Sequence, residues 1–152
     1  MKKILVITII ILVAASLHAF AFNGIKWHSL SEGMERAKTE KKPMIVDFFY
    51  GKGCQRCEFL QTQVYDDLSI AAKIMNDFIP IRIDLAGKLT KEEEKLGNQY
   101  DYKNDCLLLF LDHNGNLVRQ PGGKNLCFVD RIEPEWFIKY LDMVKEGYVK
   151  NK

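Results

Sequence analysis

A dense apolar segment, a glycine loop and two closely spaced cysteines together constrain this chain more than any other feature. The run from Met44 to Tyr50 is mostly apolar and aromatic and is bounded by Pro43 and by the Gly51–Gly53 segment, which predicts a buried central strand. Glycines at both ends of the short segment predict a loop, and helical periodicity begins at Cys54. The sequence therefore predicts a strand, a loop and a helix that carries Cys54 and Cys57 on its first turn.

Helix and strand patterns alternate along the rest of the chain. A capping-box pattern at Ser29–Glu32 predicts a helix that ends at Lys41–Pro43, and Pro134 suits the first position of a closing helix. Further helices are predicted over residues 54–68, 69–77 and 88–100, and strands over residues 79–85 and 107–111. The predicted core stripes are Cys57, Leu60, Val64 and Leu68 on one helix and Phe137, Ile138, Leu141 and Val144 on the last.

A hairpin follows the last strand. The Asp112–Asn116 segment contains an Asn-Gly pair, which tolerates positive φ and predicts a turn. The residues Leu117–Arg119 are predicted to continue the hairpin, which Pro121–Gly123 would end. Helices between strands imply parallel pairing, and the hairpin adds antiparallel pairing. The fold class is therefore α/β, with a mixed central sheet of four or five strands flanked by helices in three layers and no internal repeat.

The N-terminus predicts export. Two lysines precede an apolar run from Ile4 to Ala15, and an Ala-x-Ala pattern ends at Ala21, as in a secretory signal peptide. An uncleaved membrane anchor is the alternative, but the apolar run is shorter than the roughly 20 residues of a spanning helix. We therefore expect a signal peptide over residues 1–21, one domain over residues 22–152, a periplasmic or other extracytoplasmic location, and no stable membrane insertion after cleavage.

The charge balance excludes some classes of partner. The full chain has 22 Lys and Arg against 20 Asp and Glu, and the excess of two comes from Lys2 and Lys3. The exported part is therefore neutral, which gives no reason to expect binding to nucleic acid or to an anionic membrane.

The Cys54-Gln55-Arg56-Cys57 motif has the spacing and the setting of a reactive dithiol. A helix N-terminus favours thiolate over thiol, and Arg56 adds a cation two residues from Cys54. The offset of three residues brings Cys57 back beside Cys54 on the first turn. Cys54, nearer the exposed end, is expected to attack a partner's disulfide, and Cys57 to resolve the mixed disulfide.

Two other interpretations of the pair stay open. The pair could form a passive structural disulfide, or it could be half of a zinc site. No second Cys-x-x-Cys is present, since Cys106 and Cys127 are far apart, and neither His28 nor His113 stands in ligand-like spacing.

The sequence resembles the thioredoxin-like family, in particular exported thioredoxin-related proteins and the C-terminal domains of periplasmic thiol:disulfide interchange proteins. The resemblance covers nearly all of the chain after the signal, and the cysteine motif in its strand–loop–helix setting is its specific part. The other matching stretches are Trp27 with residues 29–37, then residues 42–49, Glu58, and residues 81–84, 100–102 and 110–115. It implies a thioredoxin-like fold, protein dithiol or disulfide partners, no cofactor, and a membrane reductant-conducting protein as electron donor.

Three positions depart from the family pattern. Cys106 stands where the family usually has a cis-proline, and a cis bond before a non-proline residue costs about 2.5–4 kcal/mol, so a trans bond is expected there. Gly53 stands where tryptophan often precedes the first cysteine. Phe48 occupies the position of the family's buried acid, so Asp47 accepts the proton of Cys57 only if the loop holds one extra residue.

Cys106 and Cys127 admit several interpretations. They could be inert thiols or could pair in a second disulfide that closes a loop of about twenty residues and stabilises the fold by roughly 3 kcal/mol. Alternatively, Cys106 could place a third sulfur beside Cys54 and Cys57, as in a redox relay or a soft-metal or iron–sulfur site.

Two functions follow from these residues. The leading hypothesis is an exported thiol–disulfide oxidoreductase, an enzyme that exchanges disulfides with protein partners through Cys54 and Cys57, supported by Arg56, Asp47 and Cys106. The alternative is a binding or metal-handling module that keeps the fold and uses Cys54, Cys57 and Cys106 without general exchange activity.

Overall fold

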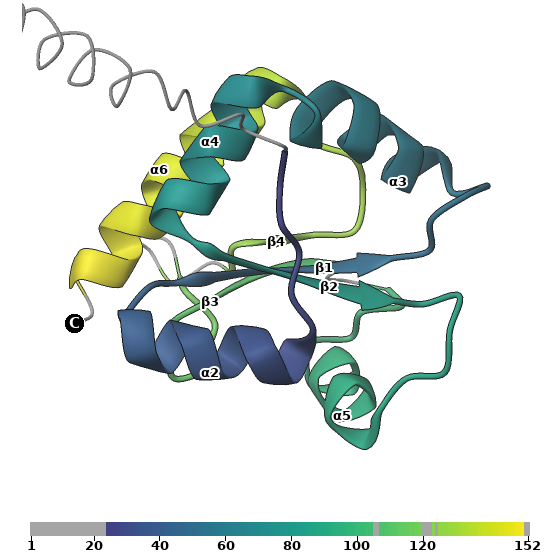
Figure 1. Ribbon diagram of the computed structural model, residues 1–152, viewed down its shortest axis with the longest axis horizontal. Coiled ribbons are helices and arrows are strands. Elements are labelled where there is room, and N and C mark those ends of the chain that lie inside the picture. The colour runs from purple at the N-terminus through teal and green to yellow at the C-terminus, as the bar shows by residue number, and fades with distance from the viewer. Residues whose placement is uncertain (1–23, 105–106, 120–122, 124, 151–152) are drawn as a thin grey trace, which may run out of the picture.

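Four strands form one mixed sheet in the computed structural model, which describes residues 24–104, 107–119, 123 and 125–150 (Figure 1). The strand order is β2-β1-β3-β4, with β1 parallel to β2 and antiparallel to β3, and β3 antiparallel to β4. The elements in chain order are α2 (Leu30–Glu40), β1 (Met44–Phe49), α3 (Gln55–Phe59), η1 (Leu60–Tyr65), α4 (Leu68–Asp77), β2 (Ile79–Asp84), α5 (Lys91–Gln99), β3 (Leu108–Leu111), β4 (Cys127–Phe128) and α6 (Pro134–Lys150). The predicted α/β class and mixed sheet are confirmed, with four strands where four or five were predicted.

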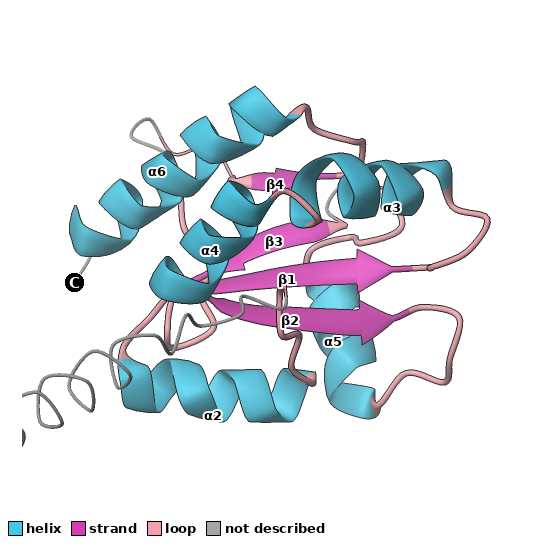
Figure 2. Ribbon diagram, turned by 45° about the horizontal axis from the view of Figure 1, so that its top comes forward, coloured by secondary structure: helices cyan, strands magenta, loops and turns pink. Residues whose placement is uncertain are grey.

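Helices cover both faces of the sheet, which gives three layers (Figure 2). Helices α2 and α5 lie on one face, and α3, α4 and α6 lie on the other. Because successive side chains of a strand point to opposite faces, Met44, Val46 and Phe48 of β1 pack on the α2 face. Ile45 packs on the opposite face, and the same alternation assigns Asp47 to that face, beneath α3. The central strand therefore carries a carboxylate to the side of the sheet that holds the cysteines.

The predicted start of the first helix is confirmed, but only half of its capping box forms. Ser29 is the N-cap of α2, and its hydroxyl accepts a hydrogen bond from the Glu32 backbone N–H. The Glu32 carboxylate instead accepts from Nδ1 of the buried His28 at 2.7 Å. A histidine just before the cap competes for the carboxylate, because it needs a polar partner when it is buried.

Two residues of the predicted core stripes are exposed. Leu68 is 66% exposed because the cysteine helix ends before it, and Asp67 caps the new helix α4 with Oδ1 accepting from Ser69 and Ile70. Ile138 is 36% exposed because it lies at the edge of the buried face of α6, which carries Phe137 and Leu141. Cys57, Leu60 and Val64 are buried as predicted.

The hairpin after β3 differs from the prediction in its second strand. The turn forms as predicted, with the Asp112 N–H donating to the Asn116 carbonyl and Gly115 at φ +91. Leu117, however, makes only an isolated bridge to Leu111. The sheet continues instead at β4, which pairs with Leu108 and Leu109. Arg119 and Asn125, which lie between these two stretches in sequence, form a further isolated antiparallel bridge. Most of the predicted Pro121–Gly123 terminator lies outside the described residues.

The predicted signal peptide over residues 1–21 lies outside the described residues. Within the part of the chain that the structure describes, no helix is both long and apolar enough to cross a membrane.

Candidate active site

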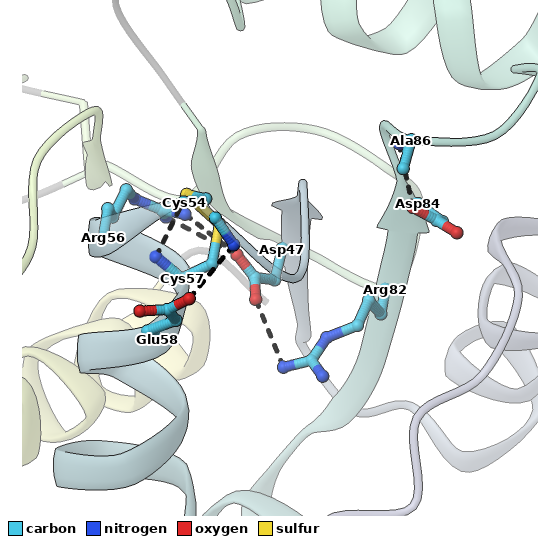
Figure 3. Close-up of a disulfide and its surroundings, with 9 residues drawn as sticks. Asp47, Cys54, Arg56, Cys57, Glu58, Arg82, Asp84 and Ala86 are labelled. Atoms are coloured by element: carbon cyan, nitrogen blue, oxygen red, sulfur yellow. Dashed lines mark hydrogen bonds and ion pairs between the residues drawn. A yellow bond between two sulfur atoms is a disulfide. The ribbon is translucent and has the colours of Figure 1, made fainter.

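Cys54 and Cys57 form a disulfide at the start of α3, directly after the carboxyl end of the central strand β1 (Figure 3). Cys54 is the N-cap of the helix and has extended backbone angles, and the two Cα atoms are 5.2 Å apart. The predicted strand–loop–helix setting of the pair is confirmed.

The two cysteines differ in exposure. Cys57 is 1% exposed, whereas Cys54 is partly exposed. The backbone N–H of Cys57 donates to the Cys54 sulfur at 3.2 Å, which is a contact that would also stabilise a thiolate at this atom. Only Cys54 therefore offers a sulfur to another protein without a change in the helix.

The loop before Cys54 depends on two glycines with positive φ, Gly51 at +72° and Gly53 at +90°. The N–H of Gly53 donates to the Glu58 carboxylate at 3.0 Å, and the N–H of Cys54 donates to the Gly51 carbonyl at 3.3 Å. Residues with a Cβ rarely adopt this conformation, so the loop explains why Gly53 replaces the tryptophan that is common in the family.

Replacing Gly53 with alanine is expected to destabilise the oxidised protein by about 1–2 kcal/mol because of backbone strain alone. No atom lies within 4 Å of the Cβ that the substitution would add, so a steric clash does not contribute. Urea unfolding measures the effect. Gly87→Ala is the matched control, since Gly87 lacks a positive φ and its added Cβ would make ordinary contacts at 3.6 Å. Equal stability of the Gly53 variant and the wild type would contradict the strain argument.

Asp47, and not Phe48, faces the cysteine helix. Asp47 is fully buried, and its carboxylate meets Arg56 from α3. Phe48 points to the opposite face, where its ring packs 5.1 Å from the ring of Tyr102. Asp47 lies seven residues before Cys54, one more than the acid of the family pattern. The Gly51–Gly53 loop accommodates the additional residue, which is the condition stated above for Asp47 to act on Cys57.

Two arginines pair with the buried carboxylate (Figure 3). Arg56 approaches Asp47 Oδ1 at 3.4 Å, and Arg82 approaches Oδ2 at 3.4 Å. Arg82 is the register partner of Asp47 on the parallel strand β2, so both side chains point to the same face. Burial raises the pKa of Asp47 above its ordinary value, and the charges of Arg56 and Arg82 oppose this effect. Arg56, predicted as a cation for Cys54, is therefore already paired with an acid.

Aromatic rings hold Arg82 in place. Its guanidinium carbon lies 4.0 Å from the ring centroids of both Trp27 and Phe49, which is a cation–π arrangement. Its Nη1 donates to the Gln61 side chain at 3.2 Å. Arg82 is therefore fixed independently of its contact with Asp47.

Tyr65 of η1 completes the surroundings of the carboxylate. Burial and then the Asp47 charge raise the pKa of Tyr65 well above its ordinary value. The Tyr65 hydroxyl is buried and makes no hydrogen bond of good geometry within the described residues. It lies near enough to lower the pKa of Asp47, against the effect of burial.

From the sequence alone, no role was assigned to Arg82, Tyr65 or Glu58. A charged residue among Ile79, Ile81 and Ile83 was the available signal for Arg82. Its partner follows only from the register of β1 and β2, which the sequence does not supply.

The hypotheses on Cys106 lie outside the described residues, including its peptide bond, its pairing with Cys127 and a third sulfur beside the motif. No cysteine among the described residues is free. Within the same residues, no group of three or more His, Cys, Asp or Glu side chains is arranged to hold a metal ion.

A mixed sheet between helical layers, with a disulfide after its central strand, defines the thioredoxin class of fold. The sequence model of the thioredoxin-like family matches residues 26–112, more than half of the 152 residues, so the chain belongs to the thioredoxin-like family. A comparison with curated protein sequences finds no match.

Two solved structures are similar in fold. One is a thioredoxin from Thermus thermophilus, with a TM-score of 0.61, 18% identity, and coverage of 85% of this chain and 94% of that one. The other is a DsbH oxidoreductase, with a TM-score of 0.55, 18% identity, and coverage of 87% of this chain and 90% of that one. At this identity the similarity shows the fold.

Proposed function

We propose that the protein is an exported thiol–disulfide oxidoreductase that exchanges disulfides with protein partners through Cys54 and Cys57. The observation that carries the proposal is the disulfide itself, with one partly exposed and one buried sulfur at the end of the central strand. Family membership and the name of the DsbH neighbour support the same chemistry.

In the reducing direction, the Cys54 thiolate attacks one sulfur of a partner disulfide. A mixed disulfide forms, and the partner's other sulfur leaves as a thiolate. Cys57 then loses its proton and attacks the Cys54 sulfur, which releases the partner's second sulfur as a thiolate. The Cys54–Cys57 disulfide forms, and the partner gains two electrons.

The buried carboxylate of Asp47 is the proposed acceptor for the Cys57 proton. It is joined to the motif through Arg56, the residue before Cys57, and burial raises its pKa, which favours proton uptake by this carboxylate. The proton then passes to the departing thiolate of the partner.

Export belongs to the same proposal. Residues 1–21 would direct the chain out of the cytoplasm, and the domain over residues 22–152 would act there on protein disulfides or dithiols. A membrane protein that conducts reductant would return the pair to the dithiol state after each reductive cycle.

Reduction of insulin disulfides with a small dithiol as electron donor tests the activity. The wild-type domain is expected to accelerate insulin precipitation, and a Cys54→Ser/Cys57→Ser double variant is expected to match the uncatalysed rate. A folded, reduced wild type without turnover would contradict the proposal and favour a binding module. The reduction potential of the pair then distinguishes a reductase near thioredoxin from an oxidase near DsbA, which differ by about 150 mV.

A further inference from the structure

Three charged side chains from three different elements meet beneath the cysteine helix. Asp47 comes from β1, Arg82 from β2 and Arg56 from α3 (Figure 3). The Asp47 side chain is 0% exposed, that of Arg56 10% and that of Arg82 19%. Charges this deeply buried interact more strongly than they would in water.

The side chains of Arg56 and Arg82 differ in how many other contacts fix them beside the carboxylate. Stacking on Trp27 and Phe49 and the bond to Gln61 fix Arg82 within the scaffold. Arg56 donates from Nη1 and Nη2 to a single carboxylate oxygen at 3.4 and 3.5 Å, at the weak end of hydrogen bonding. The Nε of each arginine has no hydrogen-bond partner within the described residues, so the difference between them lies in the ring stacking and the Gln61 bond of Arg82. Arg56 is thus the adjustable partner of Asp47.

The contact between Arg56 and Asp47 can affect the cysteines because of where Arg56 lies in the chain. Arg56 lies between the two cysteines, on the short helix that Cys54 caps. Without the Arg56 charge, Asp47 would be compensated by Arg82 alone. A less compensated buried carboxylate disfavours a second negative charge nearby, and the thiolate of the reduced pair is such a charge.

We propose that Arg56 is a positioning residue that acts on the cysteine pair through Asp47: it compensates the buried carboxylate and thereby favours the Cys54 thiolate. This inference rests on the proposed function, because it assigns a role within the exchange reaction. The alternative is that the Arg56 charge stabilises the Cys54 thiolate directly. In that mechanism Asp47 has no role. Among the described residues, the other titratable groups that act on the carboxylate are Arg82 and Tyr65.

A double-mutant cycle on the reduced protein tests the proposal. The variants are Arg56→Met, Asp47→Asn and their combination, and the readout is the rate of Cys54 alkylation against pH, followed by mass spectrometry of the Cys54 peptide. We expect Arg56→Met alone to lower the rate at neutral pH by about threefold to tenfold, since one pKa unit changes the thiolate fraction tenfold. In the Asp47→Asn background the same substitution is expected to change the rate by less than about twofold, because no carboxylate remains to be compensated.

Lys52→Met is the matched control. Lys52 lies two residues before Cys54, as Arg56 lies two residues after it, but its side chain is exposed. It is expected to change the alkylation rate by less than about twofold in either background. An equal or larger effect of Arg56→Met in the Asp47→Asn background would overturn the proposal and show that Arg56 acts on Cys54 directly.

Two further measurements keep the result interpretable. Cooperative unfolding of each variant shows that it is folded, and Arg56→Gln replaces Arg56→Met if the latter is not. Alkylation needs no partner protein, so the two assays are independent. Failure to reduce insulin would refute the proposed function, whereas the double-mutant cycle would still test the role of Arg56.

Discussion

Replacing Cys57 with serine is expected to trap a covalent adduct between Cys54 and a substrate protein. Cys54 is the partly exposed cysteine and Cys57 is 1% exposed, so the first attack on a partner falls to Cys54. Without the Cys57 sulfur, the mixed disulfide has no internal nucleophile to resolve it. Non-reducing electrophoresis after incubation of the reduced variant with an oxidised substrate detects the adduct.

Cys54→Ser is the matched comparison, because it leaves a single thiol of the same motif in the buried position. It is expected to form no adduct, and its insulin turnover should fall by at least about a thousandfold, as is common when a catalytic nucleophile is removed. Adducts formed by Cys54→Ser and not by Cys57→Ser would reverse the assigned roles. Equal trapping by both variants would show that burial does not determine which cysteine attacks.

The order of elements could be predicted from the sequence because local rules determine it. Pro43 and Gly51 bound the central strand, and side-chain oxygens cap the helices at Ser29 and Thr90. The second strand of the hairpin is shorter than predicted, reduced to a bridge at Leu117 and a hydrogen bond from Val118 to Phe110, and the reason is non-local. The segment from Leu117 has an acceptable strand pattern, but the edge of β3 pairs mainly with Cys127 and Phe128, which lie further along the chain.

The sequence predicted the cysteine pair of the candidate site. It did not predict the ion pairs of Asp47 with Arg82 and Arg56. The spacing of Cys54 and Cys57 follows from the geometry of one helical turn, which a sequence displays directly. The pairing of Asp47 with Arg82 depends on the register between two strands that lie 35 positions apart at this pair. The inward turn of Arg56 depends in turn on that carboxylate being beneath the helix.

Asp47 is expected to contribute a loss of stability as the pH rises, and Asp47→Asn is expected to remove this contribution. Burial raises the pKa of Asp47 in the folded protein above the unfolded value of about 3.9. Between the two pKa values the folded state binds a proton that the unfolded state has released. The contribution of Asp47 to the free energy of unfolding therefore decreases as the pH rises through this window, by up to about 1.4 kcal/mol per pH unit, and is constant above it.

Urea unfolding of the oxidised wild type and of Asp47→Asn across the acidic to neutral range measures the difference. The variant keeps the size of the side chain, so the stability of the variant relative to the wild type should increase with pH and reach a plateau above the folded pKa. Asp84→Asn, which removes an exposed carboxylate from the end of β2, controls for the loss of one negative charge at the surface. The opposite trend, in which the wild type gains stability over the variant as the pH rises, would mean that Arg56 and Arg82 outweigh burial at Asp47. In that case Asp47 would stay ionised throughout and could not be the acceptor of the Cys57 proton.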